Sequence, residues 1–324
     1  MGAFLSRAGH DVTLVDTVAE HVEAINRAGL RITGPIAEFS TPVPAFTPDA
    51  LHGTWDSVIL ATKAHHTTAA AEALLPHLTA TGAVVSAQNG LNELAIAEVV
   101  GQARTVGAFV NFGADYLEPG VVLYGGRGTV AVGEAFGRME SRRSRRVLRI
   151  RDAWQDFDER ALATANIFGY LWAKEAYGAM LFATALTNDS IADALAAPEY
   201  RELYIALARE ILAVAVAEGV QPESFDGFDP AAYFPDAPAG AAERSLDDLV
   251  AHNRKSAKTH SGIWRDLAVR KRPTEVDAQL GIIVRLGAAA GVPTPLTARV
   301  VTMIQEIERG VRPLARENLD VLAS

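Results

Sequence analysis

The chain of 324 residues contains no cysteine. This absence excludes disulfide bonds, thiolate metal ligands and a cysteine nucleophile, and it fits a reducing, cytoplasmic setting. No signal-peptide pattern of basic, apolar and small residues opens the sequence. Charged residues make up only 21% against 49% hydrophobic residues, which is ordinary for a globular protein. The length allows two domains and a large core.

Positive charge is the scarcer sign. The net charge of −9 argues against a general nucleic-acid-binding protein. Seven arginines do gather between residues 138 and 151, but acidic residues follow them at once. This pattern predicts a solvent-exposed helix with many charged side chains and not a surface that binds nucleic acid. We therefore expect no nucleic-acid partner.

The apolar run Asn166–Thr187 approaches the length of a membrane span, and Lys174 and Glu175 are its only charged residues. A Lys-Glu pair at its centre would be costly in lipid, so we expect a helix buried in protein and no membrane association. A lysine is seldom buried without a partner or a task, and a lysine held away from water gives up its proton more readily. Lys174 is thus a candidate general acid. The alternative is that it lies at the helix rim and extends to water.

The N-terminal half alternates short apolar strands with helices. Strands are predicted near Val12–Val15, Val58–Ala61, Ala83–Ala87 and Thr105–Phe109, and helices near Val18–Ala28, Thr67–His77 and Leu91–Val99. This alternation predicts right-handed βαβ units, and so a Rossmann-type α/β domain with a parallel sheet between two helical layers. Val121–Tyr124 and Thr129–Val132 are predicted to be antiparallel strands.

The sequence lacks the glycine-rich turn with which such a sheet holds a dinucleotide. Asp16 ends the strand that would be second in the sheet, yet no preceding strand and no G-x-G-x-x-G turn stand before it. We expect an N-terminally truncated domain, with about 15 to 20 residues missing because the start codon was assigned late. Asp16 is predicted to bind ribose hydroxyls and, by repelling a 2′-phosphate, to favour NAD over NADP. Its alternative role is to cap the next helix.

Two other strand ends carry polar side chains. Thr62 and Lys63 follow one strand and Asn89 follows the next, and ligands of parallel sheets lie beyond such ends. Lys63 is expected to hold an anion and Asn89 a carboxylate or a ribose, although Asn89-Gly90 is also a common turn sequence. The two adjacent histidines at 65–66 have no acid at ligand spacing, so we expect no metal site.

After about residue 161 the strands stop. Helices are predicted at Asn166–Thr187, Pro198–Glu218, Ala242–Val269, Glu275–Ala290 and Leu296–Arg309. The chain is thus expected to divide into a dinucleotide-binding domain, residues 1–160, and an all-α substrate domain, residues 161–324.

Two groups in the helical half are candidates for binding a substrate. Glu275 could serve only as a first-turn acid of its helix, or it could face Lys174 and bind a substrate hydroxyl. Ser261 and its neighbours Lys258–His260 offer hydroxyls and a cation for a substrate carboxylate. Ser261 could equally be a residue of the helix surface.

Motifs in both halves support a family resemblance. They are Ala8–Asp16, Thr62–Ala64, Gln88–Gly90, Leu171–Lys174, and Ser261–Asp266 leading into Arg272–Asp277. Their order and spacing resemble the ketopantoate reductases (2-dehydropantoate 2-reductases) over essentially the whole chain. The resemblance implies a Rossmann domain, a helical domain and hydride transfer from a nicotinamide to a 2-oxo acid in pantothenate biosynthesis. It also implies NADP(H) as the family's usual cofactor, where Asp16 favours NAD(H), and it leaves room for a homodimer.

The resemblance assigns roles to individual residues. Lys174 matches the catalytic lysine that donates a proton to the new alkoxide, and Glu275 matches the acid that binds the substrate and supports that lysine. Thr62, Lys63 and Asn89 match positions at the cofactor. Lys63, Asn89 and Ser261 match positions at the substrate.

The chain also departs from the family pattern. Gly178 and Phe182 stand where the pattern has asparagines, and Ser261 is about one residue out of register. The reaction type is therefore expected to transfer better than the substrate, with 2-dehydropantoate the leading choice among branched or polyhydroxylated 2-oxo acids. Two alternatives stay open: a non-catalytic truncated homologue that binds metabolites or proteins, and another hydroxyacid- or opine-type dehydrogenase.

Overall fold

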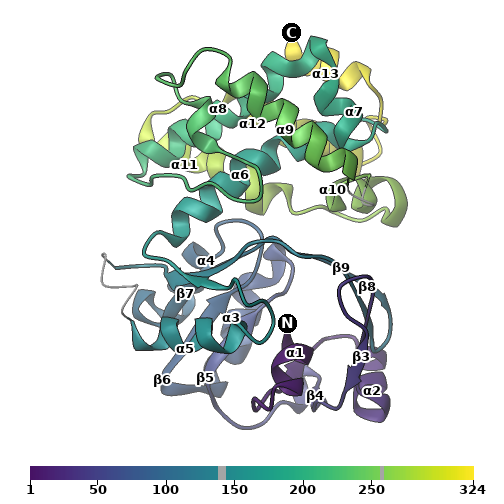
Figure 1. The fold of residues 1–324 in the computed structure, drawn as a ribbon, viewed down its shortest axis with the longest axis vertical. Coiled ribbons are helices and arrows are strands. Elements are labelled where there is room, and N and C mark those ends of the chain that lie inside the picture. The colour runs from purple at the N-terminus through teal and green to yellow at the C-terminus, as the bar shows by residue number, and fades with distance from the viewer. Residues whose placement is uncertain (138–143, 256–258) are drawn as a thin grey trace. The chain divides into compact units, whose positions relative to one another are not determined.

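The computed structural model describes residues 1–137, 144–255 and 259–324, and the chain divides into two compact units. The first unit comprises Met1–Thr62, His66–Gln88 and Glu93–Ile167, and the second comprises Lys63–His65, Asn89–Asn92 and Phe168–Ser324. The first unit contains the sheets and the second is helical (Figure 1). Two short segments that lie within the sequence of the first unit therefore belong to the second.

The first unit is built on a five-stranded sheet in the order β11-β10-β7-β6-β5. The strands are β5 (Trp55–Leu60), β6 (Leu78–Ser86), β7 (Thr105–Val110), β10 (Val130–Glu134) and β11 (Leu162–Ala163). β5, β6 and β7 are parallel, as the alternation of strands and helices predicts, while β10 runs antiparallel to β7. The α/β fold class is thus confirmed, although the sheet is mixed.

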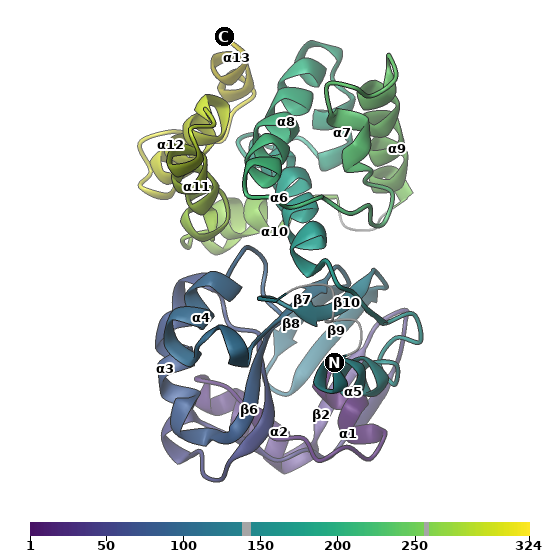
Figure 2. The ribbon, with the colours of Figure 1, turned by 90° about the vertical axis from the view of Figure 1, so that its left-hand side faces the viewer.

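Helices cover both faces of this sheet. The neighbouring residues Val84 and Val85 of β6 belong to two different apolar clusters, because successive side chains of a strand point to opposite faces. The cluster around Val84 includes residues of α3 (Thr67–Leu74) and α4 (Glu93–Val100), and the cluster around Val85 includes Trp154 at the end of α5 (Arg145–Trp154). Figure 2 shows α3 and α4 on one side of β6 and α5 on the other. The basic segment that predicts α5 lies partly outside the described residues.

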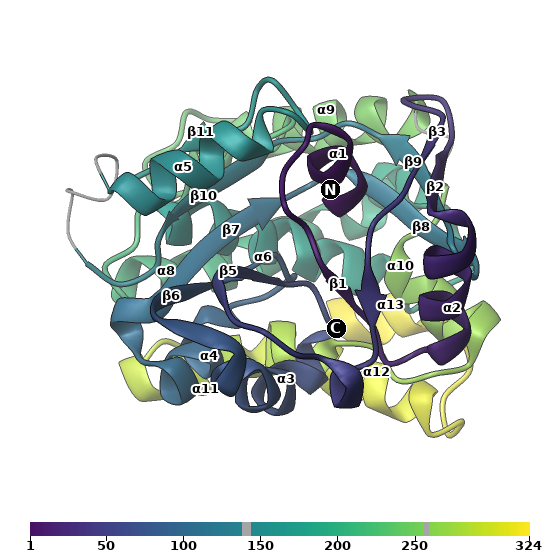
Figure 3. The same cartoon turned by 90° about the horizontal axis from the view of Figure 1, so that it is seen from below.

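Two smaller sheets complete the first unit. β1 (Leu14–Val15) pairs in parallel with β4 (Ala45–Phe46), and β2 (Leu30–Thr33), β3 (Phe39–Thr41), β8 (Gly113–Glu118) and β9 (Val121–Gly126) form a four-stranded sheet in the order β3-β2-β9-β8. Figure 3 shows this second sheet beside α2 (Ala19–Ala28) and apart from β5 and β6. α1 (Gly2–Arg7) packs against β2 and β3.

The strand pairing corrects one expectation from the sequence and confirms another. β1 lies in a sheet of its own with β4, and in the described part of the chain β5 pairs on one side only, with β6. The strands predicted at 121–124 and 129–132 do take part in antiparallel pairs, as the sequence predicts, each with a different partner strand. β9 pairs with β8 and β2, and β10 pairs with β7 and β11. The pairing of β9 with β2 joins segments about ninety residues apart, which local patterns do not encode.

The second unit consists of helices around the apolar helix α6. They are α6 (Ile167–Thr184), α7 (Ile191–Ala196), α8 (Arg201–Ala217), α9 (Ala241–Lys255), α10 (Gly262–Trp264), α11 (Ile282–Ala290), α12 (Pro295–Glu308) and α13 (Glu317–Ala323), with π-helical turns at Arg265–Arg270 and Asp277–Gly281. The helix predicted over 242–269 is not continuous, because Ser261 begins α10 anew; residues 256–258 lie outside the description. Within the described residues, no helix combines the length and apolarity needed to cross a bilayer.

Candidate active site

Lys174 sits in the middle of α6, partly exposed, and donates a hydrogen bond from Nζ to Asn89 Oδ1 at 2.7 Å. Asn89 lies in the turn 89–92, which belongs to the same unit. Asn92 ties this turn by donating from Nδ2 to the Asn89 carbonyl at 2.6 Å. Gly90 has φ +100°, a conformation that favours glycine, so the Asn89-Gly90 sequence does form a turn and also presents Asn89 to the lysine. The structure thus brings together two predicted site residues, 85 positions apart.

Glu275 is 9% exposed and both of its carboxylate oxygens have partners. Oε2 accepts from Lys63 Nζ at 2.7 Å, and Oε1 accepts from the Ala64 backbone N–H at 2.7 Å. The sequence predicts Lys63 and Glu275 as site residues but pairs Glu275 with Lys174. The direct contacts in the structure are instead to the segment that follows β5.

Asp266, a motif residue with no role predicted from the sequence, forms the other side of the Lys63 environment. Its Oδ2 lies 3.7 Å from Lys63 Nζ, and its Oδ1 accepts from Arg270 and Arg272 at 2.9 Å each. Burial acts to raise the pKa of Asp266, but the hydrogen bonds from the two arginines outweigh it and hold the pKa below its usual range. Asp266 is therefore an anion at neutral pH and fixes these cations.

Glu175 is the group that sequence reasoning misses. It follows Lys174 on α6 and is 2% exposed. Burial raises the pKa of Glu175 to about 7; Lys174 opposes the shift, Glu275 adds to it, and the Gly90 N–H opposes it. The signal in the sequence is a lone acid in a helix that is otherwise apolar apart from the neighbouring lysine.

The charges of this cluster favour an anionic ligand. The cluster contains four cations, two carboxylates that are paired with cations, and Glu175. The cations are Lys63, Lys174, Arg270 and Arg272, and the paired carboxylates are Asp266 and Glu275. The net charge of the cluster is positive whether Glu175 is protonated or not. An anion with a carbonyl or hydroxyl group near Lys174 suits this field.

Ser261 is buried and accepts a hydrogen bond at Oγ from the Trp264 N–H at 3.1 Å. It is the buried N-cap of α10, so the alternative of a residue on the helix surface is wrong. His260 stacks on Trp264 with ring centroids 4.1 Å apart. Lys258, expected beside them, lies outside the described residues.

The remaining candidates, Asp16 and Thr62, belong to the first unit. Asp16 is exposed at the end of β1, and its Oδ1 accepts from the Val18 N–H at 2.8 Å, ahead of α2. Thr62 accepts from Gln88 Nε2 at its carbonyl (2.8 Å) and at Oγ1 (3.4 Å). Gln88 thereby ties together the ends of β5 and β6.

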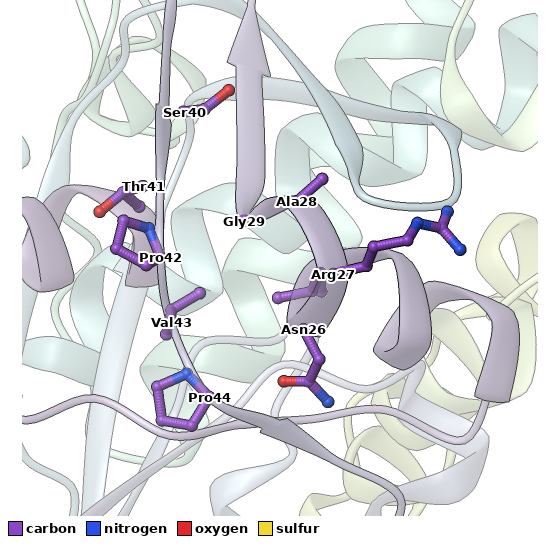
Figure 4. Close-up of a pocket in the computed structure, with 10 residues that line it drawn as sticks. Asn26, Arg27, Ala28, Gly29, Ser40, Thr41, Pro42, Val43 and Pro44 are labelled. Carbon is purple, nitrogen blue, oxygen red and sulfur yellow. The ribbon is translucent and has the colours of Figure 1, made fainter.

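A cavity of about 590 Å³ opens in the first unit between the end of α2 and the β3–β4 connection. Figure 4 shows its lining, with Arg27, Thr41 and the two prolines Pro42 and Pro44. Asn26 donates to the Ala45 carbonyl and accepts from the Ala45 N–H, which fixes its amide against β4. The cavity contains none of the predicted site residues. No group of three or more metal-ligating side chains occurs in the described ranges.

Two family models match the chain. One, described as "Ketopantoate reductase PanE/ApbA", matches residues 1–137, and one for the C-terminal part of the same family matches residues 166–308. The 2-dehydropantoate 2-reductase of Archaeoglobus fulgidus is 28% identical over 314 residues, 96% of this chain and 94% of that protein. The enzyme of the same name from Pyrococcus horikoshii is 33% identical over 180 residues, which is only 54% of this chain and 55% of the relative.

Solved structures show the same architecture. A PanE/ApbA family ketopantoate reductase from Ralstonia eutropha superposes with a TM-score of 0.77 at 25% identity, covering 96% of this chain and 95% of that one. A D-mandelate dehydrogenase solved with NADH and anilino(oxo)acetate gives a TM-score of 0.80 at 20% identity, with the same coverage. The latter likeness is one of fold alone.

Proposed function

The chain belongs to the ketopantoate reductase family, and on that premise we propose that it reduces a 2-oxo acid to the 2-hydroxy acid with a reduced nicotinamide nucleotide. The observation that carries this proposal is the Lys174 ammonium, held by Asn89 at 2.7 Å within a cluster of net positive charge. Such a site attracts an anionic 2-oxo acid and offers a proton donor to its carbonyl oxygen.

Lys174 acts as the general acid. When the carbonyl carbon gains a hydride, its oxygen becomes an alkoxide, and the ammonium first stabilises and then protonates this oxygen. Asn89 accepts one N–H of the ammonium and so fixes its direction, which spares the orientation entropy of a free lysine. A bound nicotinamide supplies the hydride.

Glu275 and Lys63 organise the substrate side. Glu275 holds Lys63 and the Ala64 amide in place, and its carboxylate can accept a substrate hydroxyl once Lys63 turns towards the substrate carboxylate. Ser261, five residues before Asp266, is proposed to supply a further hydroxyl to the substrate. We propose 2-dehydropantoate, the substrate named for the relatives, as the first 2-oxo acid to test.

Asp16 is our candidate for holding the ribose of the cofactor. Asp16 is exposed, with Val18 bound at one oxygen only, and it suits ribose hydroxyls; its charge favours NADH over NADPH. By the family resemblance we also assign Thr62 of the first unit, and Lys63 and Asn89 of the second, to cofactor binding. The sequence contains no G-x-G-x-x-G turn for the pyrophosphate. We further propose a cytoplasmic enzyme and a homodimer; one structural neighbour is described as a dimeric ketopantoate reductase from Staphylococcus aureus.

The test is the reduction of 2-dehydropantoate by the full chain, with NADH and NADPH compared, in the wild type and in Lys174→Ala. We expect kcat to fall by about 10²-fold or more in the variant, since general acid catalysis contributes that much. Lys255→Ala, at the exposed end of α9, serves as the control and should keep the wild-type rate. A Lys174→Ala enzyme with a near-normal rate would remove the lysine from the mechanism, and equal use of NADPH would refute the role of Asp16.

A further inference from the structure

Glu175 is a buried carboxyl that the proposed reaction does not use. It is 2% exposed, and its Oε2 has no hydrogen-bond partner among the residues described. The Gly90 N–H is the backbone donor that faces it. A carboxylate ion left with so few donors in a buried position is costly, whereas the neutral acid needs fewer. The geometry therefore suits the protonated form.

The turn that Glu175 contacts is the turn that orients the general acid. Gly90 follows Asn89, whose Oδ1 accepts from Lys174 Nζ at 2.7 Å. A Cβ at position 90 would stand 3.4 Å from the Ala278 carbonyl and 3.4 Å from the Gln279 side chain, so this turn is also packed against the chain after Glu275. A change at Glu175 thus reaches Lys174 by two routes, along α6 and through the turn.

Among the residues that the structure describes, the charges of two side chains act on Glu175. Lys174 is its neighbour on α6, and Glu275 approaches it from the segment before the π-helical turn. Glu275 is already neutralised by Lys63 and by the Ala64 N–H. Because two close carboxyls resist double ionisation, Glu175, with fewer donors, is the one that keeps its proton.

We propose that Glu175 is a positioning residue, which holds the Asn89–Gly90 turn against α6 while it is neutral and draws the Lys174 ammonium away from Asn89 when it ionises. The inference rests on the proposed function for its kinetic consequence only. Ionised Glu175 would compete for the ammonium with Asn89 and with the substrate oxygen. It would also make Lys174 a weaker acid and reduce the attraction for an anionic substrate.

The pH range follows from the burial of the group. Since burial raises the pKa of Glu175 to about 7, the switch between the two forms falls near neutrality. A purely structural role, filling space between α6 and the turn, would give no inflection in the reaction at this pH. A pH profile therefore separates the two roles.

The kinetic test compares the wild type with Glu175→Gln, which keeps the size and an acceptor oxygen but cannot ionise. We expect the wild-type kcat/KM to fall about tenfold between about pH 6 and pH 8, and the variant to match it at the lower pH and to lack the inflection near neutrality. Glu210→Gln is the matched control, because Glu210 on α8 also accepts backbone N–H groups, those of Leu296 and Thr297, away from the site. An inflection that persists in Glu175→Gln overturns the proposal.

A second measurement needs neither substrate nor a folded variant. Infrared difference spectroscopy of the wild-type chain during a pH titration reports the C=O stretch of a protonated carboxyl. We expect such a band to disappear near neutral pH, and to be absent from Glu175→Gln where that variant folds. If all carboxyls of the wild type are ionised by about pH 6, the proposal is wrong whatever the kinetics show. An inactive wild type would defeat the proposed reaction and leave this titration to decide on Glu175.

Discussion

Lys63 illustrates which aspects of the site a sequence encodes. Its place after a strand predicts a site residue, and the structure puts it 2.7 Å from Glu275, 212 positions away. The same reasoning paired Glu275 with Lys174, because both belong to the helical half. Which lysine reaches the acid depends on the path of the segment after β5, and residue spacing carries no information about that path. The candidates were predictable; their pairings were not.

Gly178 offers a test of specificity at the scale of one side chain. It lies one turn after Lys174 on α6, on the same face, and a Cβ there would meet nothing within 4 Å. Gly178→Asn should therefore fit without strain and place an amide beside the general acid. We expect kcat/KM for a 2-oxo acid with a side-chain hydroxyl to rise about fivefold relative to one without it, the value of one hydrogen bond.

The measurement is the ratio of kcat/KM for the two 2-oxo acids. Gly178→Ala is the control, because it fills the same space with no hydrogen-bonding group and should leave the ratio unchanged. If the asparagine variant shows the ratio of the wild type, position 178 does not face the substrate.

At the scale of elements, long apolar helices were predictable and short ones were not. α6 and α12 agree closely with the predicted 166–187 and 296–309. α7 and α13, six and seven residues long, were missed. Helices of this length are not stable alone and form because tertiary packing buries one face, as it buries Leu319 and Leu322 of α13.

Because Glu175 lies on α6, the free energy of unfolding should depend on pH. The pKa of Glu175 in the folded chain, about 7, lies above the ordinary value of 4.5, so the folded state binds more protons between these limits. The free energy of unfolding therefore falls as the pH rises from the ordinary pKa to the folded one, by roughly 3 kcal/mol, and changes no further above it.

Urea unfolding of wild type and Glu175→Gln checks this sign. The variant should gain stability relative to the wild type between about pH 5 and pH 8, by roughly the same 3 kcal/mol. The stability difference between variant and wild type must be measured at both pH values, because the amide also changes the packing, and that contribution is the same at each pH. An equal difference at the two pH values would mean that Glu175 is ionised throughout.

At the scale of the whole chain, the second unit is not one continuous stretch of sequence. Lys63–His65 and Asn89–Asn92 belong to it, together with Phe168–Ser324. A change from strands to helices along the chain predicts a single boundary, after residue 160, because composition and periodicity follow sequence order. That boundary between domains stays a prediction, and no periodicity marks segments of three or four residues that join another unit.

The isolated fragment 161–324 should therefore be poorly stable. It lacks Lys63 and the Ala64 amide, so Glu275 loses both of these hydrogen-bond partners. Hydrogen bonds to a charged group contribute about 1.5 to 3 kcal/mol each. We expect the free energy of unfolding of the fragment to be lower than that of the full chain by roughly 2 kcal/mol or more.

Far-UV circular dichroism during urea unfolding measures this difference, with Glu275→Gln in the full chain and in the fragment as the matched control. The substitution should destabilise the full chain, where the partners are present, more than the fragment. An equal effect in both would show that the helical part supplies Glu275 with other partners.

The segments Lys63–His65 and Asn89–Asn92, which belong to the helical unit, also matter for protein engineering. A chimera that exchanges the sheet-bearing part between relatives at a single crossover point would import foreign versions of Lys63 and Asn89 together with it. The reductive centre of such a hybrid would be mismatched even if every helix were native. Successful recombination requires that these two loops travel with the helices they serve.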